Sequence, residues 1–193
     1  MFFYDHLGCK LFEEITALPE YYLTRTEKKL IKKAALALGK NLDHFHIIEL
    51  GSGDCSKISI FLENIPSEYL DNISYVPFDV SQKAIEDSSK NLQQKFPDLE
   101  IEGVVADFLT QLDHIPYSKN RLICFFGSTI GNLTKPQAQE FFNNLSTILK
   151  PADHFLLGID RVKDKSVLEN AYNDSKNITE KFNKNILNVV NHL

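Results

Sequence analysis

The stretch His46-Ile47-Ile48-Glu49-Leu50-Gly51-Ser52-Gly53 decides the fold, because an apolar run ends in an acid and passes at once into a Gly-x-Gly turn. Glycines let the backbone turn sharply at the end of a parallel strand, and their missing Cβ lets a ligand approach the main chain. A second acid, Asp79, ends the next apolar run, where a carboxylate can accept hydrogen bonds from both hydroxyls of a ribose. A strand that leaves through an ordinary flexible loop is the alternative, and the second acid favours a nucleotide-type cofactor over it.

Two classes of cofactor use a glycine turn followed by an acid after the second strand: the dinucleotides and S-adenosylmethionine. A dinucleotide requires a third glycine, in the pattern G-x-G-x-x-G, so that a helix N-terminus can approach its pyrophosphate. Here Ser56 stands at that position. The ammonium and carboxylate of S-adenosylmethionine can instead meet the turn from Glu49 to Gly53, which includes Ser52, together with Lys57. The sequence therefore favours S-adenosylmethionine, with S-adenosylhomocysteine as its product.

The rest of the chain alternates between short apolar runs and amphipathic stretches, which indicates strands alternating with helices. Its 193 residues suffice for one full domain with a core of its own, and are too few for two large ones. Predicted strands cover residues 46–50, 73–78, 100–105, 121–126 and 155–159, and predicted helices cover residues 56–65, 81–96 and 134–149, the last with a Thr134/Gln137 capping box. This alternation predicts an α/β fold, a Rossmann-like and mostly parallel, doubly wound sheet.

Two helices are predicted before the first strand. Apolar residues at helical spacing between Leu7 and Leu18 predict one helix, which Pro19 ends. Residues 24–27 are predicted to form a capping box that opens a second helix, and Gly39 is predicted to end it as its C′ residue.

In an open sheet of this kind, ligands bind beyond the carboxyl ends of the strands. Asp107 and Phe108 follow the third predicted strand and suit an adenine, because a carboxylate can accept from the exocyclic amine while a ring covers one face. As an alternative, Asp107 simply caps a short helix. The turn of residues 127–132 follows the fourth strand, and its Gly127 and Ser128 are predicted to belong to the cofactor site as well.

Composition and charge argue against several other classes of protein. The net charge is −5, and the lysines at 28, 29, 32 and 33 alternate with apolar residues, which indicates a solvated helix face and no nucleic-acid partner. No apolar segment is long enough to span a bilayer, so no membrane partner is expected. Three cysteines in a chain without a signal peptide predict a reduced, cytoplasmic protein. The six histidines lack metal-ligand spacing, so no metal is predicted.

Five runs of the sequence resemble one family of enzymes. They are residues 3–8 (FYDHLG), 15–27 (ITALPEYYLTRTE), 49–53 (ELGSG), 127–132 (GSTIGN) and 171–172 (AY), and residues 156–164 and 182–185 extend the likeness. Together they span nearly the whole chain, and the longer runs are too specific to match by chance. In these respects the chain is similar to the histidine-specific, S-adenosylmethionine-dependent methyltransferases of ergothioneine biosynthesis.

The resemblance implies an activity and a set of site residues. Members of the family methylate the α-amino nitrogen of histidine three times to give hercynine, and a related branch methylates other amino acids such as a prenylated tryptophan. By the same likeness, the cofactor would be held by Gly51, Lys57, Asp79, Asp107 and Phe108, and the amino and carboxylate groups of the amino acid by Tyr4, Asn132 and Tyr172. Tyr21 would face the substrate side chain and Phe182 would help to close the pocket, while Tyr4 and Asn132 would orient the reacting nitrogen. Ordinary half-buried packing is the alternative role of the three tyrosines.

The chain departs from this family in its length. Family members are much longer, so the resemblance implies that the chain stops inside the substrate region and lacks the last strands of the sheet. Residues 25–161 would form the cofactor-binding methyltransferase domain, and residues 1–24 and 162–193 a partial substrate region. Three interpretations stay open: an N-methyltransferase, a cofactor-binding remnant without turnover, and an NAD-dependent oxidoreductase. The apolar edge of the fifth predicted strand, residues 155–159, predicts a homo-oligomer or a separate chain that carries the missing half.

Overall fold

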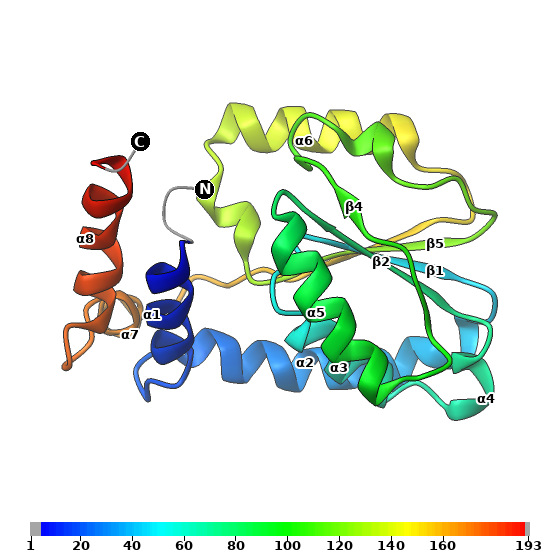
Figure 1. Cartoon of the computed structure of the whole chain (residues 1–193). Coiled ribbons are helices and arrows are strands. Elements are labelled where there is room, and N and C mark those ends of the chain that lie inside the picture. The colour runs from blue at the N-terminus through cyan, green and yellow to red at the C-terminus, as the bar shows by residue number, and fades with distance from the viewer. Residues whose placement is uncertain (1–4, 192–193) are drawn as a thin grey trace. The chain divides into compact units, whose positions relative to one another are not determined.

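The computed structural model of the chain describes residues 5–191, which divide into two compact units (Figure 1). The larger unit is Lys28–Ile159 and contains the sheet. The smaller unit combines the described residues up to Glu27 with those from Asp160 onward. None of the helices within residues 5–191 is both long enough and apolar enough to cross a membrane.

The larger unit is built on a parallel sheet of six strand segments. They are β1 (His46–Leu50), β2 (Ser74–Asp79), β3 (Glu100–Ile101), β4 (Val104–Val105), β5 (Arg121–Phe125) and β6 (His154–Leu157). The spatial order is β3-β2-β1-β5-β6, with β4 also paired to β2, and every pairing is parallel. The chain therefore winds outward from β1 in both directions, which confirms the predicted doubly wound α/β fold and places a topological switch point at the end of β1.

The prediction of one continuous third strand over residues 100–105 is wrong. It is divided into β3 and β4, and both pair with β2. At the division, a Cβ on Gly103 would come within 2.5 Å of Ile85 Cγ2. The backbone passes so close to this side chain of helix α5 that only glycine fits, and the strand is interrupted there.

Five helices belong wholly or mainly to the larger unit. They are α2 (Tyr22–Leu38), α3 (Ser56–Glu63), α4 (Ser67–Leu70), α5 (Gln82–Lys95) and α6 (Lys135–Ile148). The predicted capping box of α6 is confirmed, because the Thr134 and Gln137 side chains each bond the other residue's backbone N–H. Ser81 likewise caps α5 by accepting a hydrogen bond from the Ala84 N–H. Both helix starts follow from local sequence alone.

The predicted start of the second helix is wrong, whereas its end is correct to within one residue, because α2 ends at Leu38, directly before Gly39. Helix α2 already begins at Tyr22, so Thr24 lies inside its first turn. The preceding turn is held by Arg25, whose guanidinium donates to the carbonyls of Leu18 and Pro19, each at 2.6 Å. Gly39 starts a 3₁₀ turn, Gly39–Asn41, and a Cβ there would lie 3.0 Å from Pro66 Cδ. Close packing, and not a left-handed helix end, therefore explains this glycine.

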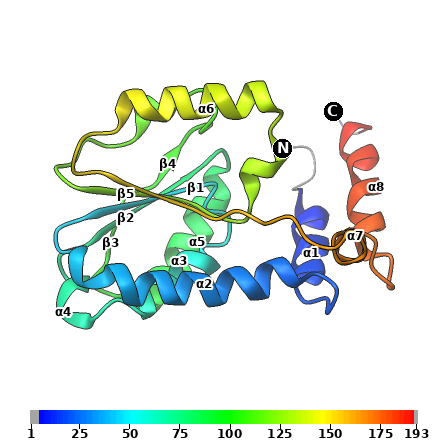
Figure 2. The same ribbon diagram turned by 180° about the vertical axis from the view of Figure 1, so that it is seen from behind.

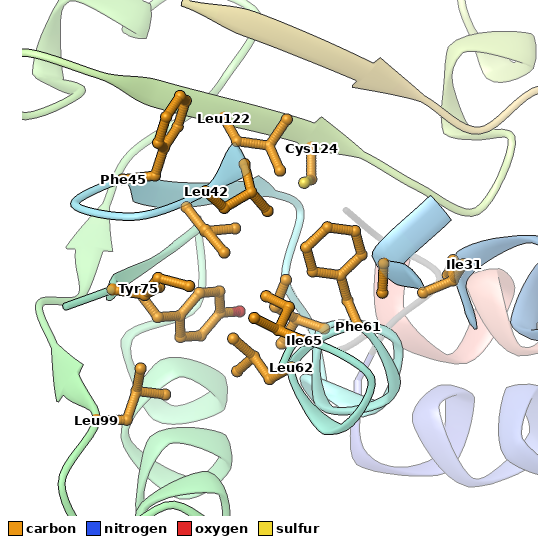
Figure 3. Close-up of a cluster of buried hydrophobic side chains, with 14 of the residues drawn as sticks. Ile31, Leu42, Phe45, Phe61, Leu62, Ile65, Tyr75, Leu99, Leu122 and Cys124 are labelled. Carbon is orange, nitrogen blue, oxygen red and sulfur yellow. The ribbon is translucent and has the colours of Figure 1, made fainter. Parts of the chain in front are cut away.

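Helices cover both faces of the sheet, and Figures 1 and 2 show α6 on one side with α2 and α3 on the other. The sheet has one hydrophobic core on each face, and successive residues of β1 contribute to different cores. Ile47 belongs to the core formed with α2, α3 and α5, and Ile48 to the core formed with α6. Figure 3 shows the first of these cores, to which Phe61 and Leu62 of α3 and Tyr75 of β2 contribute. This layering positions the carboxyl ends of β1, β2 and β5 as the edge where the predicted site residues gather.

The smaller unit is helical. It contains α1 (His6–Thr16), residues 22–27 of α2, α7 (Lys165–Tyr172) and α8 (Ile178–Val190), and α1 packs against α8. Asp5 caps α1 at the Gly8 N–H and also accepts a hydrogen bond from the buried Asn185 amide at 2.6 Å. This hydrogen bond, between residues far apart in the sequence, thus links α1 to α8.

Asp174 fixes the start of α8. Its carboxylate accepts hydrogen bonds from the backbone N–H groups of Ile178 at 3.0 Å and Thr179 at 2.8 Å. Burial alone would raise the pKa of Asp174, but these backbone hydrogen bonds favour the charged form more strongly and lower the pKa to about 2. The carboxylate therefore remains ionised, as a helix N-terminus prefers.

Candidate cofactor and substrate sites

The turn after β1 has the backbone conformation that its glycines allow. Gly51 and Gly53 have φ values of +68° and +53°, in the left-handed region. The Gly51 N–H donates to the Phe78 carbonyl of β2 at 2.8 Å, which ties the turn to the neighbouring strand. A Cβ on Gly51 would lie 3.6 Å from the Phe108 ring, and nothing lies within 4 Å of a Cβ on Gly53. The turn is therefore an open backbone surface with an aromatic ring at its edge.

Asp79 lies against this turn, as predicted from its place at the end of β2. Its Oδ2 accepts a hydrogen bond from the Gly53 N–H at 3.1 Å, and its Oδ1 accepts one from the Ser81 N–H at 3.0 Å. Two backbone amides thus fix the orientation of the carboxylate. Each carboxylate oxygen can accept more than one hydrogen bond, so this group retains the capacity to bind a ribose diol.

Asp107 and Phe108 have separable roles in the structure. Asp107 Oδ1 accepts the Leu109 N–H at 2.8 Å, and the Asp107 N–H donates to Gln111 Oε1 at 2.8 Å, so this carboxylate caps a tight turn. The Phe108 ring packs edge-on against Phe125 with a centroid distance of 5.0 Å. One oxygen of the Asp107 carboxylate therefore has the capping role that was the alternative to adenine binding. Phe108 lies beside the glycine turn.

Lys57 reaches from α3 to the turn that follows β5. A Cβ on Gly127 would lie 3.0 Å from Lys57 Nζ and 3.1 Å from Thr129 Oγ1, and the φ of Gly127 is +80°. Both the conformation and the neighbouring ammonium therefore require glycine here. Ser128 is also left-handed, with φ +54°, and the exposed Asn132 ends the 3₁₀ turn Thr129–Asn132.

The structure brings most of the predicted cofactor residues together at one edge of the sheet. The direct neighbours are Gly53 with Asp79, Gly51 with Phe108, and Lys57 with Gly127. Glu49 and Ser52 are different, because only 2% and 5% of their surfaces are exposed. Sequence reasoning missed Tyr75, whose phenol donates to Glu49 Oε2 at 2.7 Å from the adjacent strand.

The predicted substrate residues of the smaller unit form an aromatic cluster. Tyr21, which is 8% exposed, meets Tyr172 edge-on with a centroid distance of 5.9 Å, and Phe182 contacts Phe12 at 5.9 Å. Tyr172 is 55% exposed and borders a hollow of about 470 Å³ that is otherwise lined by α8 and the segment before it. Tyr4 lies outside the described residues.

A charged cluster in the same unit was missed by sequence reasoning. The Tyr22 hydroxyl donates to Asp160, the Lys163 ammonium donates to the other oxygen of Asp160, and Lys163 Nζ lies 4.7 Å from the centre of the Tyr22 ring. Burial and the neighbouring Asp160 raise the pKa of Tyr22, so its phenol stays protonated. The Asp160 to Lys163 spacing is visible in the sequence, but Tyr22 precedes Asp160 by 138 residues. Within residues 5–191, no group of three or more metal-ligating side chains is assembled.

Comparison with known proteins identifies the family. The model of a family described as histidine-specific, S-adenosylmethionine-dependent methyltransferases matches residues 1–193. The histidine N-alpha-methyltransferase of Mycolicibacterium smegmatis is 39% identical over 189 residues, which cover 98% of this chain and 59% of that protein. Ergothioneine biosynthesis protein 1 of Neurospora crassa is 32% identical over 201 residues, covering 98% of this chain and 22% of that protein.

Solved structures of low sequence identity share the fold. A proposed S-adenosyl-L-methionine-dependent methyltransferase from Methanococcus maripaludis superposes with a TM-score of 0.58 at 18% identity, covering 100% of this chain and 84% of that one. The chain thus has a methyltransferase-type fold, although it spans only 59% of the length of the Mycolicibacterium relative. With the glycine turn, Asp79 and the match along its whole length, the chain belongs to the family of histidine-specific, S-adenosylmethionine-dependent methyltransferases.

Proposed function

We propose that the protein is an S-adenosylmethionine-dependent N-methyltransferase that acts on the α-amino nitrogen of an amino acid, with L-histidine as the substrate and hercynine as the product. The observation that carries this proposal is the pairing of Asp79 with the Gly53 amide beside the glycine turn. The relatives named above, which act on histidine or belong to ergothioneine biosynthesis, support the choice of substrate.

The residues present suit S-adenosylmethionine better than a dinucleotide. The glycine turn is open where a Cβ would stand, Asp79 can bind a ribose, and the Phe108 ring can cover an adenine. Lys57 can meet a carboxylate, whereas Ser56 occupies the position where a dinucleotide site needs its third glycine. When bound, this cofactor supplies a methyl group activated on a sulfonium.

The protein's contribution to the reaction is alignment. We assign to Asn132 and Tyr172 the binding of the amino and carboxylate groups, to Tyr21 and Phe182 the side-chain end of the substrate, and to Tyr4 a part in orienting the nitrogen. An α-amino group has a pKa of roughly 7.7–8.0, so its proton can pass to water and no strong base is needed. The reaction instead requires that the nitrogen lone pair point at the methyl group, and the amide and phenol groups of these residues can orient it by hydrogen bonds.

The cofactor assignment predicts the effect of removing one carboxylate. Asp79→Ala should weaken binding of S-adenosylhomocysteine about ten- to a hundredfold in calorimetry, because hydrogen bonds to a charged acceptor contribute about 1.5–3 kcal/mol. Asp87→Ala is the matched control, since Asp87 is an exposed residue of α5 that pairs with Lys83 on the surface. Equal binding by Asp79→Ala and the parent would disprove the ribose role.

A cofactor-binding remnant without turnover is the second candidate function. Cofactor binding and turnover are separable here, because the predicted cofactor residues all lie in the larger unit, whereas Tyr21, Tyr172 and Phe182 lie in the smaller one. Both candidates bind the cofactor, so a methyl-transfer assay against free amino acids separates them.

We further propose that the edge of β6 pairs with another strand, from a second copy or from a polypeptide that carries further strands. β6 ends the sheet order, and its Phe155, Leu156 and Leu157 form an apolar edge without charge or proline. Light scattering should therefore detect a species larger than the monomer. A compact monomer at high concentration, with fast-exchanging Leu156 and Leu157 amides, would refute this pairing.

We also propose that the protein is cytoplasmic, which we infer from its odd number of cysteines.

A further inference from the structure

Four buried polar side chains, the Tyr75 network, lie beneath the glycine turn. They are Glu49 of β1, Tyr75 of β2, Cys55 at the start of α3 and Ser88 of α5, and none is more than 4% exposed. Burying polar groups costs free energy unless they are hydrogen-bonded, so such a network persists only where its members satisfy one another.

The hydrogen bonds of the network run in a defined direction. The Tyr75 phenol donates to Glu49 Oε2 at 2.7 Å, and Cys55 Sγ lies 3.2 Å from the same phenol oxygen. The Cys55 thiol donates to Ser88 Oγ at 3.2 Å, and Ser88 donates to the Ile85 carbonyl at 3.3 Å. Each phenol, thiol or hydroxyl has one hydrogen, and these bonds use all three.

The donors of this network stay protonated. Burial, with the nearby Glu49 charge, raises the pKa of the Cys55 thiol to about 11 and holds the pKa of the Tyr75 phenol well above its usual value. In Figure 3, Tyr75 points from β2 toward Phe61 and Leu62 of α3. Cys55 is the N-cap residue of the same helix. The network is therefore a neutral set of donors around one buried carboxylic side chain.

The two ends of the network bracket the turn that receives the cofactor. Glu49 lies two residues before Gly51, and Cys55 lies two residues after Gly53. Cys55 has φ +56°, a left-handed conformation that residues other than glycine keep only where their surroundings fix it. The sulfur of Cys55 donates to Ser88 Oγ and lies against the Tyr75 oxygen, each at 3.2 Å, and these two contacts fix the residue.

We propose that Tyr75 is a positioning residue for the cofactor site, because its phenol links both ends of the Gly51–Gly53 turn and holds the turn in its binding conformation. The inference rests on the proposed function and deepens it. Glu49 then acts through the shape of the turn, in keeping with its 2% exposure, and not by touching the cofactor.

Tyr75→Phe tests the proposal, since it removes the phenol oxygen and keeps the ring in the core. Calorimetry with S-adenosylhomocysteine should show affinity about tenfold or more below that of the parent. Tyr69→Phe is the matched control, because Tyr69 packs against the same core outside the network, and it should bind as the parent does. Hydrogen exchange at the Cys55 amide should accelerate in Tyr75→Phe more than exchange at the Ile58 amide within α3.

Glu49→Gln provides rescue by a conservative change. Its amide oxygen can still accept from Tyr75, so this variant should bind within a few-fold of the parent, whereas Glu49→Leu should lose as much affinity as Tyr75→Phe. A loss in Glu49→Gln as large as in Glu49→Leu would overturn the proposal, because the carboxylate charge itself would then contact the cofactor. Parent-like affinity of Tyr75→Phe would overturn it as well.

Two further arms keep the test decisive. If Tyr75→Phe does not fold, Ser88→Ala removes the bond at the Cys55 end and should weaken binding several-fold, and parent-like binding by it would refute the role. A parent that binds no S-adenosylhomocysteine would contradict the proposed function instead. The exchange measurement needs no cofactor, so unchanged Cys55 protection in Tyr75→Phe would refute the positioning role in that case also.

Discussion

Arg121→Met is expected to lower the free energy of unfolding by about 3–5 kcal/mol, because it leaves the carboxylate of Asp153 buried without its partner. The Arg121 and Asp153 side chains are 4% and 0% exposed, with Nη2 and Oδ2 2.5 Å apart and Nε and Oδ2 3.1 Å apart. Arg121 begins β5 and Asp153 immediately precedes β6, so the pair joins two neighbouring strands. Chemical denaturation of parent and variant measures this loss.

The double variant Arg121→Met/Asp153→Leu shows how much of the lost stability comes from the unpaired Asp153 carboxylate and how much the ion pair itself contributes to the free energy of unfolding. Replacing both partners with apolar residues of similar size is often neutral or stabilising, so the double variant should recover most of the lost stability. Lys165→Met, at an exposed pair with Glu169, is the surface control and should change the free energy of unfolding by about 0–1 kcal/mol. A loss in the double variant as large as in Arg121→Met would show that shape, not charge, explains the effect.

The same ion pair has a defined pH dependence. Burial alone would raise the pKa of Asp153, but the hydrogen bonds and charge of Arg121 hold it below the usual carboxyl value. A carboxyl whose pKa is lower in the folded state stabilises the fold above its unfolded pKa. The contribution is then lost as the pH falls through the lower folded-state value.

Asn132→Ala is expected to reduce methyl transfer to histidine about a hundredfold while leaving cofactor affinity nearly unchanged. Asn132 is exposed at the end of the turn after β5, and the proposed function gives its amide the task of orienting the reacting nitrogen. Misplacing a reactant by about 1 Å can cost about a hundredfold in rate. Transfer of labelled methyl groups measures the rate, and calorimetry with S-adenosylhomocysteine measures the affinity.

Asn144→Ala is the control for this prediction, since Asn144 is exposed on α6 and has no part in the proposed site. Its transfer rate should match that of the parent. If Asn132→Ala lost cofactor affinity in proportion to its rate, Asn132 would belong to the cofactor site and its assignment to the substrate would be wrong. A parent without transfer would favour the remnant instead, as described above.

Local sequence patterns determined the elements whose cause is itself local. The glycines at 51 and 53 anticipate left-handed backbone, and Ser81 and Thr134 anticipate helix starts, because each effect involves only neighbouring residues. Asp79 could be placed beside the turn for a related reason, since parallel strands that alternate with helices bring their carboxyl ends to one edge. The fold class and the position of Asp79 against the glycine turn could therefore be predicted from the sequence.

Tertiary structure alone decided the pairs that lie far apart in the chain. The partners of Arg121, of Tyr22 and of Tyr75 are polar groups on other elements, and no periodicity specifies which buried donor will meet which acceptor. The interruption of the third strand has the same origin, because the closeness of Gly103 to Ile85 exists only once α5 has packed on the sheet. Such contacts depend on how the elements pack in three dimensions, and the order of residues along the chain does not specify which side chains will meet.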